Sequence, residues 1–229
     1  MIRKFLPVAL TLLLSLSILL SGCSEDPANL QTNAADPALK SLEDGELSDV
    51  ETHDLLWVRE EEKLARDVYI VMGEIYGLTV FANIQLSEQA HMDAMLGLLN
   101  TYGLEDPVGD NGVGEFSDHH LQDLHDGLIT EGEQSKVDAL LVGLAIEEID
   151  MIDLVDAMER SDHEDIIHTF DNLCEGSKNH LRAFVGVYES QTGETYVPRY
   201  ITQDFYDEIM GVEEDEAPVN DRKGRKPRA

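Results

Sequence analysis

Apolar residues recur at intervals of three and four along four long stretches of the chain, which is the spacing of one face of an α-helix. The pattern predicts four amphipathic helices, over Thr52–Tyr76, Val80–Tyr102, Glu133–Glu159 and Asp162–Thr192. The only strand-like stretch, Thr195–Ile201, is short and contains Pro198, which disfavours a central strand. We therefore expect an all-α fold.

The links between these stretches predict how the helices pair. A few residues around Gly77 join the first helix to the second, and a few around Ser161 join the third to the fourth, so each pair should form an antiparallel hairpin. The link from Gly103 to Gly132 is about 30 residues long and has room for one short helix near Ser117–Leu128. Two hairpins joined by one long crossover are typical of a ferritin-like four-helix bundle.

The N-terminus has the form of a secretion signal. Arg3 and Lys4 precede an apolar run over Phe5–Leu20, which is long enough for a signal peptide. The four residues Leu20-Ser21-Gly22-Cys23 resemble the bacterial lipobox. This resemblance implies that Cys23 is lipidated after cleavage, which would make membrane lipid a partner and place the protein outside the cytoplasm, anchored to the cell membrane or the outer membrane. A plain signal peptide with a chance cysteine is the alternative.

Polar and charged stretches flank the predicted bundle. We divide the chain into a signal peptide (1–22), a flexible tether (23–50) with a loose helical turn near Pro37–Leu47, a four-helix domain (51–211) and a disordered charged tail (212–229). The tail is acidic and then basic; its basic end is either solvated or in contact with anionic lipid.

Composition narrows the classes of function. The chain has 16 Lys+Arg against 47 Asp+Glu and a formal net charge of -31, spread over its length, which argues against a nucleic-acid partner. If Cys23 is lipidated, Cys174 is the remaining thiol, so packing must stabilise the fold without an internal disulfide.

Acidic or histidine side chains interrupt the apolar face of every predicted long helix. They are Glu61 and Glu62 on the first, Glu88 and His91 on the second, Glu147, Glu148 and Asp150 on the third, and His180 on the fourth. The three-residue spacing of Glu88 and His91 places a carboxylate and an imidazole one turn apart on one helix face. Burying several carboxylates is costly unless a cation or shared protons offset their charge. We therefore predict that these side chains converge on a metal ion.

Five longer motifs carry a family resemblance. They are R-E-E-E-K-L-A-R-D-V-Y (Arg59–Tyr69), S-E-Q-A-H-M-D-A (Ser87–Ala94), E-E-I-D-M-I-D-L (Glu147–Leu154), G-S-K-N-H-L-R-A-F (Gly176–Phe184) and Y-I-T-Q-D-F-Y-D-E-I-M (Tyr200–Met210). With them the chain resembles the ferritin-like di-iron carboxylate superfamily, and more closely a prokaryotic ferritin-like family of unknown function, over about Asp54–Met210.

The superfamily pattern is a Glu, a Glu-x-x-His, a Glu and a second Glu-x-x-His on four successive helices. On the first helix, the resemblance to rubrerythrin-like proteins favours Glu62, with Tyr69 seven residues later; Glu61 is the alternative. On the second helix, Glu88 and His91 match completely.

The third and fourth helices match this pattern less closely. Glu147 and Glu148 both remain candidates on the third helix, with Asp150 as a further carboxylate. On the fourth helix His180 is present, but Ser177 stands where the pattern has a glutamate, which puts one bridging carboxylate in doubt.

The resemblance implies one or two bound ions of iron, manganese or zinc, which carboxylate and imidazole ligands suit. It also implies metal handling, or an oxidoreductase that acts on a small oxidant such as oxygen or peroxide. The chain has no Cys-x-x-Cys, so a redox cycle would need an external electron donor. A metal-free helical bundle with a binding or structural role in the cell envelope is the alternative. We interpret His119, His120 and His125 as surface histidines of the crossover, with a zinc or copper site as the less favoured reading.

Overall fold

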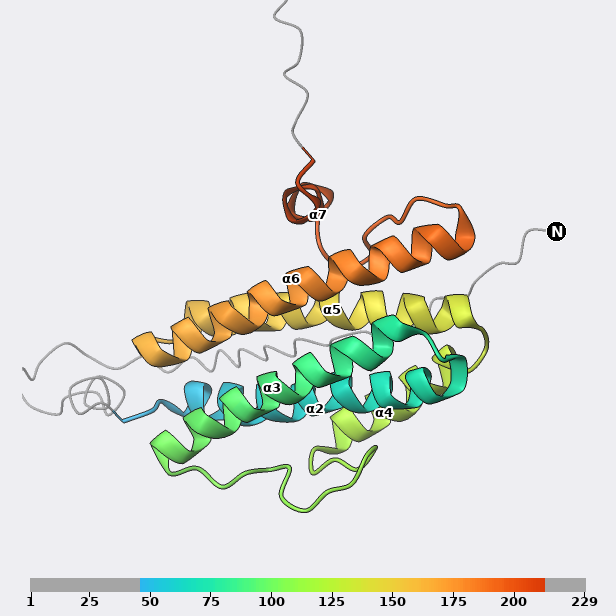
Figure 1. Cartoon of the computed structure of the whole chain (residues 1–229). Helices are drawn as coiled ribbons and strands as arrows, with labels where there is room; N and C mark the ends of the chain where they lie inside the picture. The colour runs from blue at the N-terminus through green and yellow to red at the C-terminus, as the bar shows by residue number, and fades with distance from the viewer. Residues whose placement is uncertain (1–45, 213–229) are drawn as a thin grey trace, which may run out of the picture. The chain divides into compact units, whose positions relative to one another are not determined.

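Helices account for most of residues 46–212, the part of the chain that the computed structural model describes (Figure 1). They are α2 (Asp49–Tyr76), α3 (Thr79–Tyr102), α4 (His119–Gly132), α5 (Lys136–Arg160), α6 (Glu164–Thr192) and α7 (Gln203–Met210). These residues contain no strand, so the all-α prediction is confirmed. The predicted signal peptide with Cys23, the tether as far as residue 45 and the tail from residue 213 lie outside the described residues.

Capping side chains set the ends of the helices. α2 begins three residues earlier than predicted because Ser48 and Glu51 form a capping box, in which Ser48 Oγ accepts from Glu51 N at 3.2 Å and Glu51 Oε2 accepts from Ser48 N at 2.9 Å. α5 begins later than predicted because Ser135 is its N-cap and accepts from Asp138 N at 3.1 Å. α2 ends at Gly77, whose left-handed φ of 64° suits glycine.

The four long helices form two stacked hairpins (Figure 1). α2 packs chiefly on α3, and α5 chiefly on α6, as the short links predicted. Contacts of α2 with α5 and of α3 with α6 close the bundle. Tyr69, Phe81 and Phe184 meet inside it, with ring centroids 5.2–5.9 Å apart. The apolar stripes therefore enclose a shared core.

The long crossover runs from Gly103 to Asp118 and then through α4, which packs on α2 and α5. Polar side chains of α2 hold it in place. Arg59 makes a bidentate pair with Asp106 at 3.0 and 2.9 Å, and also donates to the carbonyl of Met92 at 2.8 Å.

Three more polar residues of α2 are tied to the same crossover. Glu60 accepts from the backbone N–H groups of 117 and 118 at 2.6 and 3.1 Å. Lys63 pairs with Asp67 and donates to the carbonyl of Gly112 at 2.6 Å, while Asp67 accepts from the N–H of Gly114 at 2.9 Å. One face of the 59–67 motif thus anchors the crossover, which leaves Glu61 and Glu62 for the bundle interior.

The chain after α6 was not predicted in detail. Residues 196–201 form a loop instead of a strand, and α7 follows it and packs on α6. Arg182 of α6 helps to dock α7 by donating from Nε to the carbonyl of Ile209 at 2.7 Å. At eight residues, α7 is too short for its periodicity to stand out in the sequence.

Candidate metal centre

Five buried side chains form two groups that share one glutamate. Glu62, Glu88 and His91 make the first group, and Glu88, Glu147 and His180 make the second. Within each group the potential ligand atoms all lie within 4.8 Å of one another. We call these five residues the candidate centre.

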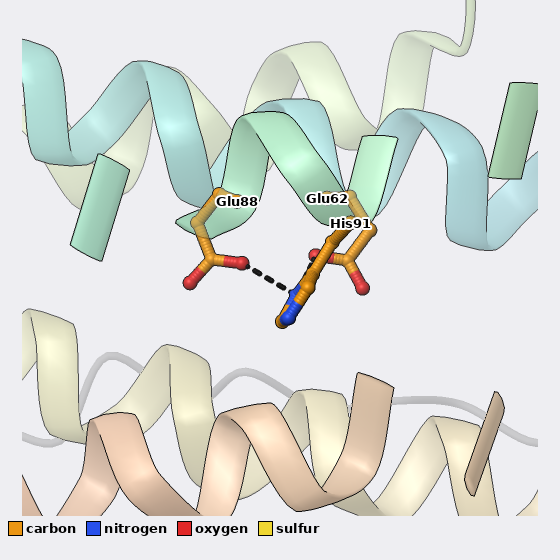
Figure 2. Close-up of side chains that lie close together, drawn as sticks. All are labelled: Glu62, Glu88 and His91. Atoms are coloured by element: carbon orange, nitrogen blue, oxygen red, sulfur yellow. Dashed lines mark hydrogen bonds and ion pairs between the residues drawn. The ribbon is translucent and has the colours of Figure 1, made fainter. Parts of the chain in front are cut away.

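Each long helix of the bundle contributes to the candidate centre. Glu88 and His91 come from one face of α3, Glu62 comes from α2, Glu147 from α5 and His180 from α6. Figure 2 shows Glu62, Glu88 and His91 pointing from the α2–α3 hairpin toward the other hairpin. The two hairpins therefore meet at this point through polar groups, although apolar side chains surround it.

The Nδ1 atom of each histidine faces two carboxylates. His91 Nδ1 lies 3.1 Å from Glu62 Oε2 and 2.9 Å from Glu88 Oε2. His180 Nδ1 lies 2.9 Å from Glu88 Oε1 and 3.4 Å from Glu147 Oε2. The two imidazole rings are stacked with centroids 5.4 Å apart. Glu88 thus offers one oxygen to each histidine, as a bridging carboxylate does.

Three buried atoms of the candidate centre have no hydrogen-bond partner in the described structure. They are Glu62 Oε1, Glu88 Oε1 and His180 Nδ1. The 2.9 Å approach between the last two therefore counts as an ion pair and lacks hydrogen-bond geometry. Buried polar atoms without partners are rare and costly in folded proteins. All three are of the types that bind divalent metals, so the residues present fit such an ion.

In the metal-free protein, the histidines compensate for the buried carboxylates. Burial would raise the pKa of Glu88, but the contacts and charges of His180 and His91 lower it to about 2. Burial would lower the pKa of His91, but Glu62 and Glu88 raise it to about 11. Against the effect of burial, Glu147 and Glu88 raise the pKa of His180 to about 10. Both imidazoles therefore hold protons near neutral pH, and metal binding at Nδ1 requires that these protons leave.

Asp150 lies beside the candidate centre, held by the serine at the position where a glutamate would complete the motif. Ser177 Oγ donates to Asp150 Oδ2 at 2.5 Å, and both residues are buried. Burial raises the pKa of Asp150 to about 7, although the Ser177 hydrogen bond opposes this. The pKa of Glu62 is raised well above its ordinary value, chiefly by burial and then by the charge of Asp150. Asp150 itself belongs to neither group of three potential ligands.

The structure separates Glu62 from its neighbour Glu61. Glu61 lies near Asp153 of α5, and burial followed by the charge of Asp153 raises the pKa of Glu61 well above the ordinary value. Glu61 belongs to neither group of three, whereas Glu62 lies with His91. Of the two residues that the sequence left open, Glu62 therefore has the position of a ligand.

The structure also separates Glu147 from Glu148. The Glu148 carboxylate accepts from the hydroxyl of Tyr196 at 2.8 Å and from the backbone N–H groups of Arg199, Tyr200 and Ile201 at 2.8, 2.6 and 3.4 Å. These donors all belong to the loop after α6. Glu148 therefore holds the C-terminal segment in place, and it belongs to neither group of three potential ligands.

Three further residues contact the candidate centre. Tyr69, which the sequence pairs with Glu62 by its spacing, donates to Glu147 Oε1 at 2.6 Å. Ser87 Oγ lies 2.8 Å from His180 Nε2, and Gly176 lies against the ring of His91. Ser87 is one helical turn before His91, which was the available signal for its side of the helix.

The remaining histidines lie elsewhere. His119 and His120 are exposed as expected, but the surface position expected for His125 is wrong, because its ring is buried against Phe116 with a centroid distance of 5.3 Å. His163 Nδ1 pairs with Glu51 Oε1 at 2.7 Å. Among residues 46–212 none of these joins a group of three potential metal ligands.

Comparison with known proteins identifies the family. The model of an uncharacterized protein domain, DUF2202, matches residues 51–213. The chain belongs to this family. Its DUF2202 domain contains every residue of the candidate centre.

A relative of the DUF2202 domain has a solved structure. The chain is 42% identical over 172 residues to the uncharacterized protein MJ0754 of Methanocaldococcus jannaschii, which is 75% of this chain and 92% of the relative. The crystal structure of hypothetical protein MJ0754 from Methanococcus jannaschii DSM 2661 matches with a TM-score of 0.70 at 42% identity, and the match covers 73% of this chain and 95% of that one. These likenesses show the family and the helical fold, and the chemistry must be argued from the site.

No helix within residues 46–212 has both the length and the apolar run that a membrane span requires.

Proposed function

We propose that this protein binds two divalent metal ions inside the helical bundle, with Glu88 as the bridging ligand. Glu62 and His91 complete one position, and Glu147 and His180 complete the other. The observation that carries this proposal is that three buried atoms, on Glu62, Glu88 and His180, make no hydrogen bond, because a metal-free core of hydrogen-bonded groups would satisfy them.

The connectivity supports membership of the ferritin-like superfamily. Two antiparallel hairpins joined by one long crossover, with ligands that project inward from all four helices, are the arrangement that ferritin-like di-metal proteins have. The departure at Ser177 leaves the candidate centre with three carboxylates and two histidines, and the serine hydrogen-bonds the carboxylate of Asp150 instead.

We propose iron, manganese or zinc as the resident metal, and oxidation–reduction with a small oxidant such as oxygen or peroxide, or metal handling, as the activity. A bound transition metal supplies Lewis acidity and, if it is iron or manganese, redox chemistry. The residues of this chain orient the site: the Tyr69 hydroxyl donates its proton to Glu147 Oε1, with the two oxygens 2.6 Å apart, and the apolar core around Phe81 and Phe184 excludes water. Electrons would come from an external donor.

We also propose that the domain is attached to a membrane outside the cytoplasm through lipid on Cys23. This rests on the signal-like N-terminus and on the lipobox-like residues 20–23. Mass spectrometry of the mature N-terminus tests it: a diacylated cysteine at position 23 is expected, and an unmodified chain that begins elsewhere would overturn this part of the proposal.

Elemental analysis of protein purified without a histidine tag tests metal binding. We expect about two equivalents of metal in the wild type and a large loss in the Glu88→Ala/His91→Ala double variant, with the helical fold retained. The matched control is His119→Ala/His120→Ala, which removes two exposed histidines and should keep the metal. Metal content that falls in the control and stays unchanged in the core variant would favour the metal-free bundle instead.

A further inference from the structure

Each histidine of the candidate centre touches the opposite hairpin through its outer ring edge. Nε2 of His180, on α6, lies 2.8 Å from Ser87 Oγ on α3. In the reverse direction, a Cβ added at Gly176 on α6 would lie only 2.5 Å from Nε2 of His91 on α3. Ser87 immediately precedes Glu88, and Gly176 immediately precedes Ser177. The two contacts therefore occupy matching positions on the two helices.

The Ser87 contact determines which nitrogen of His180 is available for metal. When Nε2 donates its proton to the serine oxygen, Nδ1 is the nitrogen left with a lone pair, and Nδ1 is the atom that faces Glu88 and Glu147. Hydrogen bonds of this kind orient metal-binding histidines and fix their tautomer. Because Ser87 is on α3 and His180 on α6, the contact also ties the two hairpins together at the candidate centre.

The Gly176 contact orients the ring of His91 by close packing, without a hydrogen bond. The ring of His91 lies against the backbone of α6, while its Nδ1 is 3.1 Å from Glu62 and 2.9 Å from Glu88. A methyl group at position 176 would lie only 2.5 Å from Nε2 of the ring, and a shift of the ring away from α6 would change the position of Nδ1 relative to the carboxylates. Glycine is disfavoured in the middle of a helix relative to alanine, so space for the ring is the physical reason for a glycine here.

We propose that Ser87 is the positioning residue of His180 and Gly176 that of His91, so that each metal position is set from the opposite hairpin and can be weakened separately. This inference rests on the proposed two-metal function. Neither Ser87 nor Gly176 is part of the Glu-x-x-His pattern; each immediately precedes its first position.

Calorimetric titration with Zn²⁺ alone tests the inference in the wild type and in the Ser87→Ala, Ser87→Thr and Gly176→Ala variants. We expect Ser87→Ala to weaken one of the two binding steps by about 10–100-fold, which is the usual effect of losing such a partner, and to leave the other step unchanged. Ser87→Thr keeps the hydroxyl and should restore the affinity. Gly176→Ala should weaken the other step, although alanine favours the helix.

Nitrogen NMR of the histidine rings in the zinc-loaded protein assigns each step to its residue. At a zinc concentration that saturates the wild type, the metal-bound Nδ1 signal should disappear for His180 in Ser87→Ala and for His91 in Gly176→Ala. Thermal unfolding in a chelator separates these losses from general damage, because Ser87→Ala loses one hydrogen bond and should still unfold cooperatively, at a temperature only slightly below that of the wild type.

The possible failures can be told apart. A wild type that binds no zinc, or that binds it equally well after Glu88→Ala/His91→Ala, overturns the proposed function and this inference with it. A wild type that binds two ions, with both steps weakened equally or neither step weakened by the variants, overturns the positioning roles alone. If Ser87→Thr bound zinc as weakly as Ser87→Ala, the hydroxyl group would not be what positions His180.

Discussion

Two adjacent glutamates of α5 should have opposite effects when each is changed to glutamine. Glu148 holds the C-terminal segment, and Glu147 belongs to the candidate centre. Glu148→Gln should lower the free energy of unfolding and leave the metal in place. Glu147→Gln should lose metal from the position that contains His180, with a smaller effect on the stability of the metal-free protein.

The size of the stability effect follows from the hydrogen bonds of Glu148. Three of its four hydrogen bonds are 2.6–2.8 Å long and end on a charged oxygen. A charged hydrogen bond contributes about 1.5–3 kcal/mol and a neutral one about 0.5–1.5 kcal/mol, so glutamine should cost about 1 kcal/mol for each, or about 3 kcal/mol in all. For a domain of this size that lowers the melting temperature by about 6–12 °C.

Two assays on the same preparations measure both effects. Urea unfolding in the presence of a chelator gives the free energy of unfolding without metal, and elemental analysis gives metal per chain. The separate roles of Glu147 and Glu148 would be refuted if Glu148→Gln lost metal while Glu147→Gln kept it, or if both variants behaved alike. Because the two residues are neighbours on one helix, local disruption of α5 cannot produce the predicted difference.

Three further predictions concern parts of the fold around the candidate centre. Arg59→Ala should lower the free energy of unfolding by about 2–3 kcal/mol, since it leaves the partly exposed Asp106 unpaired, and should speed limited proteolysis in the crossover; unchanged cleavage would contradict the anchoring role. The pKa of Glu51 is lowered to about 2, because hydrogen bonds from the α2 N-cap and from the α5–α6 turn outweigh the opposing effect of burial. Its contribution is therefore present above pH 4.5 and is lost as the pH falls toward 2, so wild type and Glu51→Gln should converge in stability over that range in acid titrations. Gly143→Ala should destabilise the protein by about 1–3 kcal/mol in urea unfolding, because the added methyl group would lie 2.7 Å from the ring of Phe184, and a neutral effect would mean that the ring moves freely.

Sequence periodicity was sufficient to predict the four long helices, because each helix buries an apolar stripe, and the short links were sufficient to predict their pairing. The eight-residue α7 has too few turns for such a stripe, and its place depends on α6 and on the four donors that Glu148 accepts. The strand-like stretch 195–201 is a loop in the structure. The N–H groups of residues 199–201 donate to the carboxylate of Glu148, which is far away in the sequence, and not to a neighbouring strand.

The candidate centre could be predicted only in part. Glu88 and His91 share a helix, so their spacing alone places them on one face. The choices between neighbouring glutamates depend instead on what each one faces across the bundle: Asp153 for Glu61, and the C-terminal loop for Glu148. The contact of Ser177 with Asp150 and that of Ser87 with His180 both join residues on different helices, and no pattern within one helix reveals them.

Anomalous X-ray diffraction from crystals of the metal-loaded protein locates bound metal ions directly. We expect two peaks inside the bundle, one between Glu62, Glu88 and His91 and the other between Glu88, Glu147 and His180. No peak beside Glu88, or peaks only at the exposed histidines of the crossover, would contradict the proposed two-metal function.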